Sequence, residues 1–275
     1  MKFLFWNIEK KQVCFDVIAD LVKDEALDVI ALAEFPKDKN DILLQKLQTI
    51  NPNFALLKPL VNEKVSVCYN KSTALVDNQF NEGKVAIKRI TSINKAPIAY
   101  IAFLHLPSKV NYNDDELAER MRTIIGSVQH FEEKIEYGQG FVLLCGDLNM
   151  NPFERGIIQA SGLNAVMESD IAKKGSRTID GIDYKFFYNP MWGFLGDLGK
   201  GTVSGTYYFN SSNHIQYFWN LYDQVLMRPE AIPYFDKNAL RIVTSSSNFN
   251  LLKKSGLIDD KNYSDHLPIT FTLNI

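Results

Sequence analysis

FVLLCGDLNMNP, residues 141–152, is the most informative stretch of this sequence. Its first five residues are apolar and have the length and composition of a buried strand, so Asp147 and Asn149 lie where that strand leaves the sheet. Side chains two residues apart on a strand project to the same side. We therefore expect Asp147 and Asn149 to share one ligand.

The end of this stretch also carries ordinary turn and helix-start chemistry. Asn151 is a good helix N-cap, Pro152 suits the first helical position, and Glu154 completes a capping box with Asn151. We therefore predict that a helix begins at Asn151. On local evidence alone, Asp147 and Asn149 are equally well explained as common turn residues, and other parts of the chain must distinguish the two interpretations.

Length and composition indicate a globular protein without a global attraction to polyanions. The 275 residues can form one large domain or two average ones, and a hydrophobic share of 46% supplies a sizeable core. The formal net charge is −2, so any contact with nucleic acid or phosphate must come from a local patch. This charge weakens the case for a tight DNA binder.

The cysteines and the apolar runs predict a soluble, cytoplasmic protein. Cys14, Cys68 and Cys145 are odd in number, scattered and set in apolar runs, so we expect buried thiols of a reducing compartment and no disulfide or zinc site. The start of the chain turns polar sooner than a secretory signal, which needs about 7 to 15 apolar residues. Since no run approaches the roughly 18 to 20 apolar residues that cross a bilayer, we expect no membrane span.

Many short β-type runs and few helical patterns are spread along the chain. The predicted strands cover residues 3–8, 29–35, 54–60, 65–69, 84–90, 98–106, 141–145, 205–209, 221–227, 241–244 and 268–273. Helices are predicted over residues 13–27 and 114–136, where apolar residues form one stripe. Because no repeat or linker interrupts this pattern, we expect a single α/β domain over residues 1–275, with sheet packed on sheet and helices outside.

Polar side chains stand at the ends of other apolar runs as well. The first run ends in Trp6-Asn7, the second ends in Ala33-Glu34, and Asp265-His266 opens the last. His105 and Asp223 lie beside other apolar runs. The polar residues at all these strand ends can therefore meet at one edge of the sheets. Clustered buried carboxylates must be protonated or must bind a cation. Oxygen ligands with little imidazole suit Mg²⁺ or Mn²⁺, which predicts metal-assisted hydrolysis of a phosphoester.

Six short strings occur in a fixed order over nearly the whole chain. They are Trp6-Asn7, Ala33-Glu34, His105-Leu-Pro107, Gly146-Asp-Leu-Asn149, Tyr222-Asp-Gln-Val225 and Ser264-Asp-His266. Each string alone is common, but in this order they resemble the endonuclease/exonuclease/phosphatase superfamily, which includes pancreatic deoxyribonuclease and the apurinic/apyrimidinic endonucleases. The resemblance implies a DNase I-like four-layer α/β sandwich: two packed, mostly antiparallel sheets flanked by helices, with the site at one edge.

The resemblance also implies roles for individual residues. Glu34 would be the principal metal ligand, with Asn7 and Asp265 at the ion or its waters. Asn7 would also contact the substrate. Asp147 and Asn149 would hold the attacking water and the scissile phosphate. The cofactor implied is Mg²⁺ or Mn²⁺.

Two histidines complete the site that the resemblance implies. His266, oriented by Asp223, would contact the phosphate or act as general base, and the choice between Asp147 and His266 as the base stays open. His105 would assist the leaving group, as in the deoxyribonuclease-like branches. Glu63 is a candidate carboxylate partner for His105.

The expected activity is divalent-metal-dependent phosphodiester hydrolysis by a nuclease acting on DNA or RNA. The alternatives are a phosphatase or phosphodiesterase for a small or lipid-derived phosphate ester, and a catalytically silent binding module. His105 stands where the apurinic/apyrimidinic enzymes place Tyr, which argues against a base-excision role. The residues before Asp223 differ from the Pro-Ala-Trp-Cys-Asp-Arg string of the inositol polyphosphate 5-phosphatases. Ala33 replaces the family's usual Gln, a change that we expect activity to tolerate.

Residues 170–215 form the least regular segment and are rich in aromatic side chains. We predict that Trp192 lies on a substrate rim, where a nucleic-acid base can stack. The aromatic residues that we expect to pack between the sheets are Phe186, Phe187, Tyr207 and Tyr208. No stable protein partner is inferred.

Overall fold

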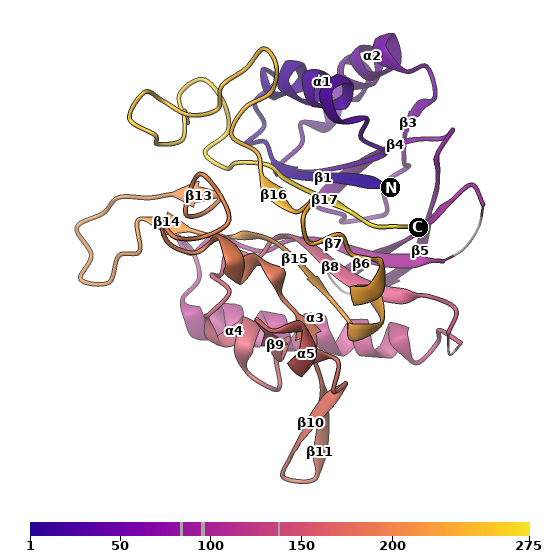
Figure 1. The fold of residues 1–275 in the computed structure, drawn as a ribbon, viewed down its shortest axis with the longest axis vertical. Coiled ribbons are helices and arrows are strands. Elements are labelled where there is room, and N and C mark those ends of the chain that lie inside the picture. Colours follow the sequence, from indigo (N-terminus) through magenta and orange to yellow (C-terminus); the bar gives the residue numbers. More distant parts are fainter. Residues whose placement is uncertain (83–84, 95–96, 137) are drawn as a thin grey trace.

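The computed structural model describes residues 1–82, 85–94, 97–136 and 138–275, and in it two β-sheets pack face to face between layers of helix (Figure 1). The first sheet has the order β16 (Arg241–Ile242), β17 (Ile269–Thr272), β1 (Lys2–Asn7), β2 (Val29–Ala33), β4 (Val65–Asn70), β3 (Phe54–Leu56). The second has the order β5 (Ala74–Glu82), β6 (Val85–Ser92), β7 (Ala99–His105), β8 (Phe141–Asp147), β15 (Asp223–Met227), β12 (Phe187–Tyr188), β9 (Ala165–Val166). Most strand pairs are antiparallel, while β1–β2, β7–β8 and β9–β12 are parallel. The predicted four-layer α/β sandwich is confirmed.

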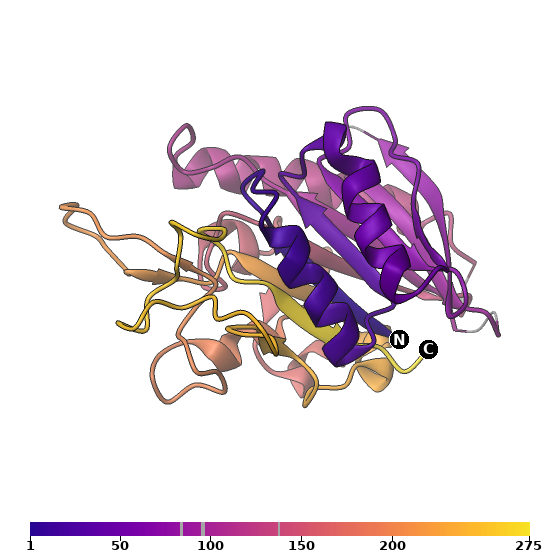
Figure 2. The same cartoon turned by 90° about the horizontal axis from the view of Figure 1, so that it is seen from above.

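Helices cover the outer face of each sheet. α1 (Cys14–Glu25) and α2 (Asn40–Ile50) lie side by side on the first sheet (Figure 2), and α3 (Asp114–Glu132) covers the second. The shorter helical elements are η1 (Lys37–Lys39), α4 (Arg155–Ile158), α5 (Ser169–Ala172), η2 (Pro190–Phe194) and η3 (Pro229–Tyr234). Two small hairpins are formed by β10 (Ser176–Ile179) with β11 (Ile182–Lys185) and by β13 (Tyr207–Tyr208) with β14 (Trp219–Asn220). In the described parts of the chain, no helix has the length and apolarity of a membrane span.

α3 begins where its sequence predicts. The Asn113 side chain accepts a hydrogen bond from Glu116 N at 2.9 Å, and Glu116 Oε2 accepts one from Asn113 N at 2.8 Å, which completes a capping box. The helix buries one apolar stripe against the second sheet. That stripe contains Leu117, Met121, Ile124 and Val128.

Side chains alternate along the central strands, so they contribute to two separate cores. The same alternation directs the site residues toward the first sheet. On β8, Cys145 belongs to the core between the sheets, whereas Leu144 packs beneath α3. Asp147 follows Cys145 by two residues and therefore points toward the first sheet. By the same alternation on β7 and β15, His105 and Asp223 point in that direction too.

Of the elements that were not predicted, α2 and β5 are the longest. β5 is an edge strand with the mostly polar sequence ALVDNQFNE, so its pattern resembles a loop. The strands predicted over residues 54–60 and 205–209 are shorter, at Phe54–Leu56 and Tyr207–Tyr208. Residue 84, the predicted start of another strand, lies outside the described residues.

The prediction that a helix begins at Asn151 with a capping box is wrong. α4 begins at Arg155, with Glu154 as its N-cap and no side-chain cap in the described chain. Asn151 Oδ1 accepts from Leu221 N at 2.8 Å, and its Nδ2 donates to Asn220 Oδ1 and Glu154 Oε1, both at 2.9 Å. Because Asn151 is buried, it is satisfied by partners from a distant segment and joins the exit of β8 to the start of β15.

Candidate active site

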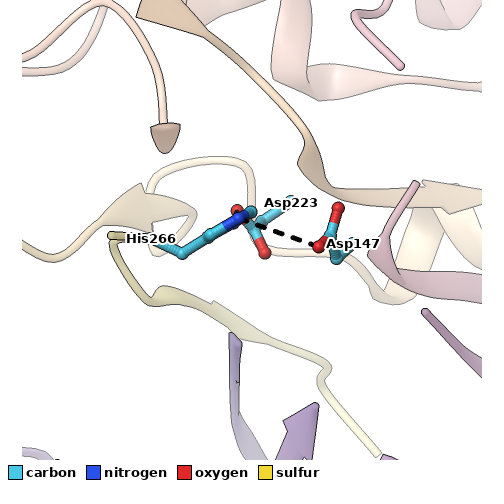
Figure 3. Close-up of side chains that lie close together, drawn as sticks. All are labelled: Asp147, Asp223 and His266. Atoms are coloured by element: carbon cyan, nitrogen blue, oxygen red, sulfur yellow. Dashed lines mark hydrogen bonds and ion pairs between the residues drawn. The ribbon is translucent and has the colours of Figure 1, made fainter. Parts of the chain in front are cut away.

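Five of the predicted site residues lie at one edge of the two sheets, because strands begin or end there. Asn7, His105 and Asp147 are the last residues of β1, β7 and β8. Asp223 is the first residue of the antiparallel strand β15, and both His105 and Asp223 lie opposite Asp147 in register. His266 stands just before β17 and reaches the same edge (Figure 3).

Asp147 lies at the centre of this group and is 1% exposed. Its Oδ2 accepts a hydrogen bond from Asn7 Nδ2 at 3.0 Å, and its Oδ1 accepts one from Asn149 N at 3.0 Å. The Nε2 atoms of His105 and His266 each lie 3.8 Å from Asp147 Oδ2. One buried carboxylate therefore faces two imidazoles, an arrangement that can hold or move a proton at Oδ2.

Asn149 turns the chain out of β8 in a left-handed backbone conformation, with φ at 49°. Asn adopts this conformation more readily than most residues, because its short polar side chain can bond locally. Asn149 Nδ2 donates to Leu106 O at 2.9 Å, which fixes the plane of the amide. A primary amide carries two N–H donors, so the second can serve a ligand beside Asp147.

His266 and Asp223 form a buried hydrogen-bonded pair. His266 Nδ1 lies 2.7 Å from Asp223 Oδ2, and Figure 3 shows the imidazole directed toward the two aspartates. The main chain of His266 is held as well: its carbonyl accepts from Trp6 Nε1 at 2.8 Å, and its N–H donates to Ser264 Oγ at 3.1 Å. The imidazole is therefore fixed with Nε2 directed at Asp147.

The two aspartates keep His266 protonated. Burial by itself lowers the pKa of the imidazole, but the charges of Asp223 and Asp147, together with the hydrogen bond to Asp223, raise the pKa of His266 to about 10. Burial also raises the pKa of Asp223, and the charge of His266 opposes that rise. We place the proton on His266, because its two nitrogens face two carboxylates.

His105 lies between Asp147 and the predicted metal ligand. Its Nε2 is 3.6 Å from Glu34 Oε1 and 3.8 Å from Asp147 Oδ2. The predicted partner Glu63 is wrong: Glu63 instead forms a buried ion pair with Lys88 on β6 and accepts from Leu60 N at 2.8 Å. A lysine without solvent exposure requires a counter-charge, and Glu63 supplies it.

Carboxylates gather on the other side of the site. Glu34 follows β2 in a left-handed conformation, with φ at 49°. Burial raises the pKa of Asp265 to about 6; the charge of His266 opposes this rise, while Glu9, Glu34 and Asp223 add to it. Asp265 N also donates to Glu9 Oε2 at 3.2 Å. Glu34, Asp265 and Glu9 therefore surround one region of negative potential.

Glu9 was not predicted as a site residue. It follows Asn7 by two residues in Trp6-Asn7-Ile8-Glu9, which is the same spacing that drew attention to Asp147 and Asn149. Its backbone N–H donates to Asn7 Oδ1 at 3.1 Å, and Lys11 Nζ lies 2.8 Å from its Oε2. This spacing was the available sequence signal for Glu9.

The hairpin of β13 and β14 closes a further side of the site. Thr206 Oγ1 accepts from Asp223 N at 3.1 Å, and Thr206 O accepts from Leu267 N at 2.8 Å. The Tyr207 ring lies against the His266 ring, with centroids 4.8 Å apart. The expectation that Tyr207 packs between the sheets is therefore wrong, because the hairpin carries it to the sheet edge.

The other aromatic residues of this segment have different environments. Phe186 packs between the sheets as predicted. The same prediction for Phe187 is wrong, because it packs beneath α3, and Tyr208 lies edge-on to Trp219. Trp192, in η2, is half-buried and lies edge-on to Phe153, with ring centroids 6.3 Å apart. Trp192 therefore belongs to an aromatic cluster beyond the exit of β8.

That aromatic cluster joins three elements. Phe153 follows β8, Trp192 lies in η2, and Tyr217 precedes β14. The centroids of Phe153 and Tyr217 are 5.1 Å apart, and Tyr217 is largely exposed. The predicted rim residue is thus part of a partly exposed aromatic surface.

Comparisons with known proteins bear on the fold. No model of a known protein family matches this chain, and no curated protein matches it in sequence. Solved structures do match it. TDP2 from D. rerio, crystallised with a single-strand DNA product, is 16% identical over 100% of this chain and 99% of its own, with a TM-score of 0.56.

Two bacterial structures are similar over the same extent. An endonuclease/exonuclease/phosphatase family protein from Bacteroides thetaiotaomicron is 11% identical over 99% of this chain and 97% of its own, with a TM-score of 0.59. Another protein described by that family name, from Leptotrichia buccalis C-1013-b, is 13% identical over 100% of both chains, with a TM-score of 0.55. The chain has, along its whole length, the DNase I-like fold of the endonuclease/exonuclease/phosphatase superfamily.

Proposed function

We propose that this protein is a divalent-metal-dependent phosphodiester hydrolase and that its substrate is DNA or RNA. The observation that carries the proposal is the environment of Asp147 Oδ2: a hydrogen bond from Asn7 and two imidazole Nε2 atoms at 3.8 Å. Carboxylates at Glu34 and Asp265 adjoin this group. Acid–base groups beside a carboxylate cluster are the combination that metal-assisted hydrolysis of a phosphoester needs.

Glu34, Asp265 and Asn7 would hold Mg²⁺ or Mn²⁺. The fit rests on electrostatics: burial together with the charges of Glu9 and Glu34 raises the pKa of Asp265 to about 6, and a cation would relieve that repulsion. Their carboxylate and amide oxygens suit a hard cation. When bound, such an ion would stabilise negative charge on the phosphoryl oxygens.

A second group of potential ligands, Asp147, Asp223 and His266, has atoms within 4.8 Å of one another. We assign this group to proton transfer and not to metal binding, because Asp223 Oδ2 and His266 Nδ1 already share a hydrogen bond of 2.7 Å. An ion at this position would have to break that bond inside a buried pair. Removing a buried carboxylate from its partner is strongly unfavourable.

The chain's own residues have separate tasks in the proposed reaction. We assign the general base to Asp147, because His266 already carries a proton, and Asn149 positions the phosphate through its second amide N–H. The Asp223 carboxylate orients His266, while His105 lies on the opposite side of Asp147, where it can assist the leaving group. Hydrogen bonds hold Asp147, Asn149 and His266 before substrate binds, so these three groups need little reorganisation.

Two observations support nucleic acid as the substrate. Aromatic side chains at Phe153, Trp192 and Tyr217 form a surface on which bases can stack, at about 1 to 3 kcal/mol per base. The D. rerio TDP2 structure contains a single-strand DNA product. We propose Trp192 as the rim residue that contacts a base.

A small or lipid-derived phosphate ester is the second candidate, and the charge distribution favours it. The chain carries a net charge of −2, and two lysines near the site are already paired. Lys11 Nζ lies 2.8 Å from Glu9 Oε2, and Lys109 Nζ lies 2.5 Å from Glu154 Oε2. Neither of these two lysines is then free to contact a long polyanion.

We further propose that residues 1–275 act as one domain in the cytoplasm. Asn7 and His266 come from opposite ends of the chain and meet at one site, which supports a single unit. Three free cysteines, all buried, support a reducing compartment. No stable protein partner enters the proposal.

A substrate panel tests the proposed function. Single-stranded DNA, duplex DNA, abasic duplex, RNA, a phosphatidylinositol phosphate and bis-p-nitrophenyl phosphate are each assayed with Mg²⁺, Mn²⁺ or EDTA, with Asp147→Ala as control. Metal-dependent cleavage of a nucleic acid that is absent in the variant supports the proposal. Cleavage of the small or lipid esters alone would favour the second candidate, and no hydrolysis of any substrate would favour a catalytically silent binding module.

A further inference from the structure

Tyr207 is held rigidly beside the catalytic histidine. Its ring centroid is 4.8 Å from that of His266 on one side and 5.4 Å from that of Tyr222 on another, with interplanar angles of 40° and 23°. The backbones of Tyr207 and His266 also form an antiparallel bridge. Two ring contacts and one main-chain contact therefore fix where the phenol lies.

The Tyr207 phenol lies among the acidic groups of the site. Burial raises the pKa of Tyr207 to about 12, and the largest acidic contributions that add to this effect are those of Asp265 and Asp147. No hydrogen bond joins the hydroxyl to another described residue, and it is not among the buried polar atoms that lack a partner, so it is open to a ligand. Tyr207 therefore offers a donor at the site that the protein does not itself use.

We propose that the Tyr207 hydroxyl donates a hydrogen bond to a non-bridging oxygen of the scissile phosphate. This inference rests on the proposed hydrolase function and adds a substrate contact to it. Negative charge on these oxygens must be stabilised during phosphoryl transfer, and a donor that is already in place does so without reorganisation. A neutral phenol also suits a carboxylate-rich site, because it donates without forming an ion pair with Asp147 or Asp265.

Tyr207 and Tyr208 form a matched pair for the test. Tyr207→Phe removes the hydroxyl and keeps the ring contacts with His266 and Tyr222. Tyr208→Phe removes a hydroxyl from the next residue of β13, whose ring lies against Trp219. The hairpin and its aromatic packing are thus preserved in both variants.

The first measurement is kcat and KM for bis-p-nitrophenyl phosphate with Mg²⁺ or Mn²⁺. This substrate has a phosphodiester and no base, so it isolates a contact with the phosphate. For Tyr207→Phe we expect kcat/KM to fall about 10- to 100-fold, mostly through kcat, as for a hydrogen bond to a charged group. For Tyr208→Phe we expect a change of less than about 2-fold.

Three results would overturn the inference. They are equal activity in wild type and Tyr207→Phe, equal losses in both variants, and a loss on DNA or RNA that is absent on the small ester. The last result would place the phenol against a base or sugar. In each case the wild-type enzyme is active, so the proposed hydrolase function survives.

Phosphate binding tests the hydroxyl if the wild-type protein hydrolyses nothing. Calorimetric titration with inorganic phosphate in the presence of Mg²⁺ should give a Kd that is about 10-fold weaker in Tyr207→Phe and unchanged in Tyr208→Phe. Absence of phosphate binding by the wild type, or equal Kd values in all three proteins, would refute the contact. Failure of the hydrolase proposal and failure of the Tyr207 proposal are thereby distinguished.

Discussion

Asn7 Nδ2 donates a hydrogen bond of 3.0 Å to Asp147 Oδ2, and this bond joins the last residue of β1 in one sheet to the last residue of β8 in the other. Both side chains are buried. The bond therefore links the packing of the two sheets to the position of the central carboxylate. A change in how the sheets pack will move Asp147 relative to Glu34 and His266.

Asn7→Ala tests this link. We expect kcat to fall about 100-fold, because a small displacement of a catalytic group has an effect of that size. Loss of a donor to a buried carboxylate should also destabilise the fold by about 1 to 3 kcal/mol, measured by urea unfolding. Asn70→Ala is the control. Asn70 is also a buried asparagine, but it ends β4 at the edge of the first sheet that lies away from the site. Equal activity in both variants would show that the Asn7 contact is structural alone.

Asp223→Asn should lower the pKa of His266. The charges of Asp223 and Asp147 raise the pKa of His266 from 6.5 to about 10, so removal of one charge reverses part of that rise. NMR titration of the His266 ring in the two proteins measures the change directly. An unchanged pKa in the variant would contradict the assignment of Asp223 as its partner.

The same pair predicts how stability depends on pH. The folded-state pKa of His266 lies above its unfolded value, so its contribution to stability is fully present below pH 6.5 and is lost as the pH rises to about 10. Urea unfolding at several pH values between these limits should show a steeper decline in wild type than in Asp223→Asn. Asp180→Asn, an exposed site in the turn between β10 and β11, should retain the wild-type slope.

Lys88→Met should be strongly destabilising. Lys88 has no solvent exposure, and it pairs with Glu63 and donates to Asn78 Oδ1 at 2.5 Å. Removal of the lysine leaves Glu63 buried without its counter-charge, which costs about 3 to 5 kcal/mol. The double variant Lys88→Met/Glu63→Gln should recover much of this loss in the free energy of unfolding. No recovery in the double variant would refute the pairing.

The three thiols should be unreactive in the folded protein. Burial raises the pKa of Cys14 and of Cys68 to about 12 and raises that of Cys145, so all three stay protonated at pH 8. Ellman's reagent should detect no free thiol at pH 8 until urea unfolds the chain, and then all three. Ser255→Cys, at an exposed position, should add one fast-reacting thiol. Rapid reaction of the wild-type protein would contradict the burial of these cysteines.

Trp192→Ala should weaken the binding of nucleic acid and leave small esters unaffected. Loss of one stacked base, at about 1 to 3 kcal/mol, corresponds to a KM increase of about 5- to 150-fold. The KM for bis-p-nitrophenyl phosphate should not change, because that substrate offers no base to stack. An unchanged KM on every substrate that the protein cleaves would remove Trp192 from the rim.

Much of the architecture and of the site was predictable from local sequence. Apolar runs such as residues 141–145 have the length and composition of strands, so the place of Asp147 at a strand end was predictable, whereas Asn149 lies beyond β8 in a left-handed conformation that alternation does not describe. α3 was predictable because its cap, first turn and stripe all agree. β5 was not, because an edge strand exposed on one side needs few apolar residues.

Contacts between segments that are distant in the sequence could not be predicted from local sequence patterns. Asn151 looked like a helix cap and instead bonds Leu221, 70 residues further along the chain. Glu63 looked available to His105 and instead neutralises Lys88. In both cases the side chain could have formed a hydrogen bond or ion pair with either of two partners. Its partner in the folded chain is the one that satisfies it where it is buried.

Strand ends and the polar residues beside them were therefore predictable from the sequence, because strand period and residue type are local properties. The partners of those residues were decided by tertiary packing. Tyr207 shows the difference: as one of several aromatics it was assigned to the core, yet the β13–β14 hairpin places its ring on His266. Hydrophobic burial is non-directional and leaves such choices open, whereas hydrogen-bond and ring geometry in the packed structure determine which groups meet.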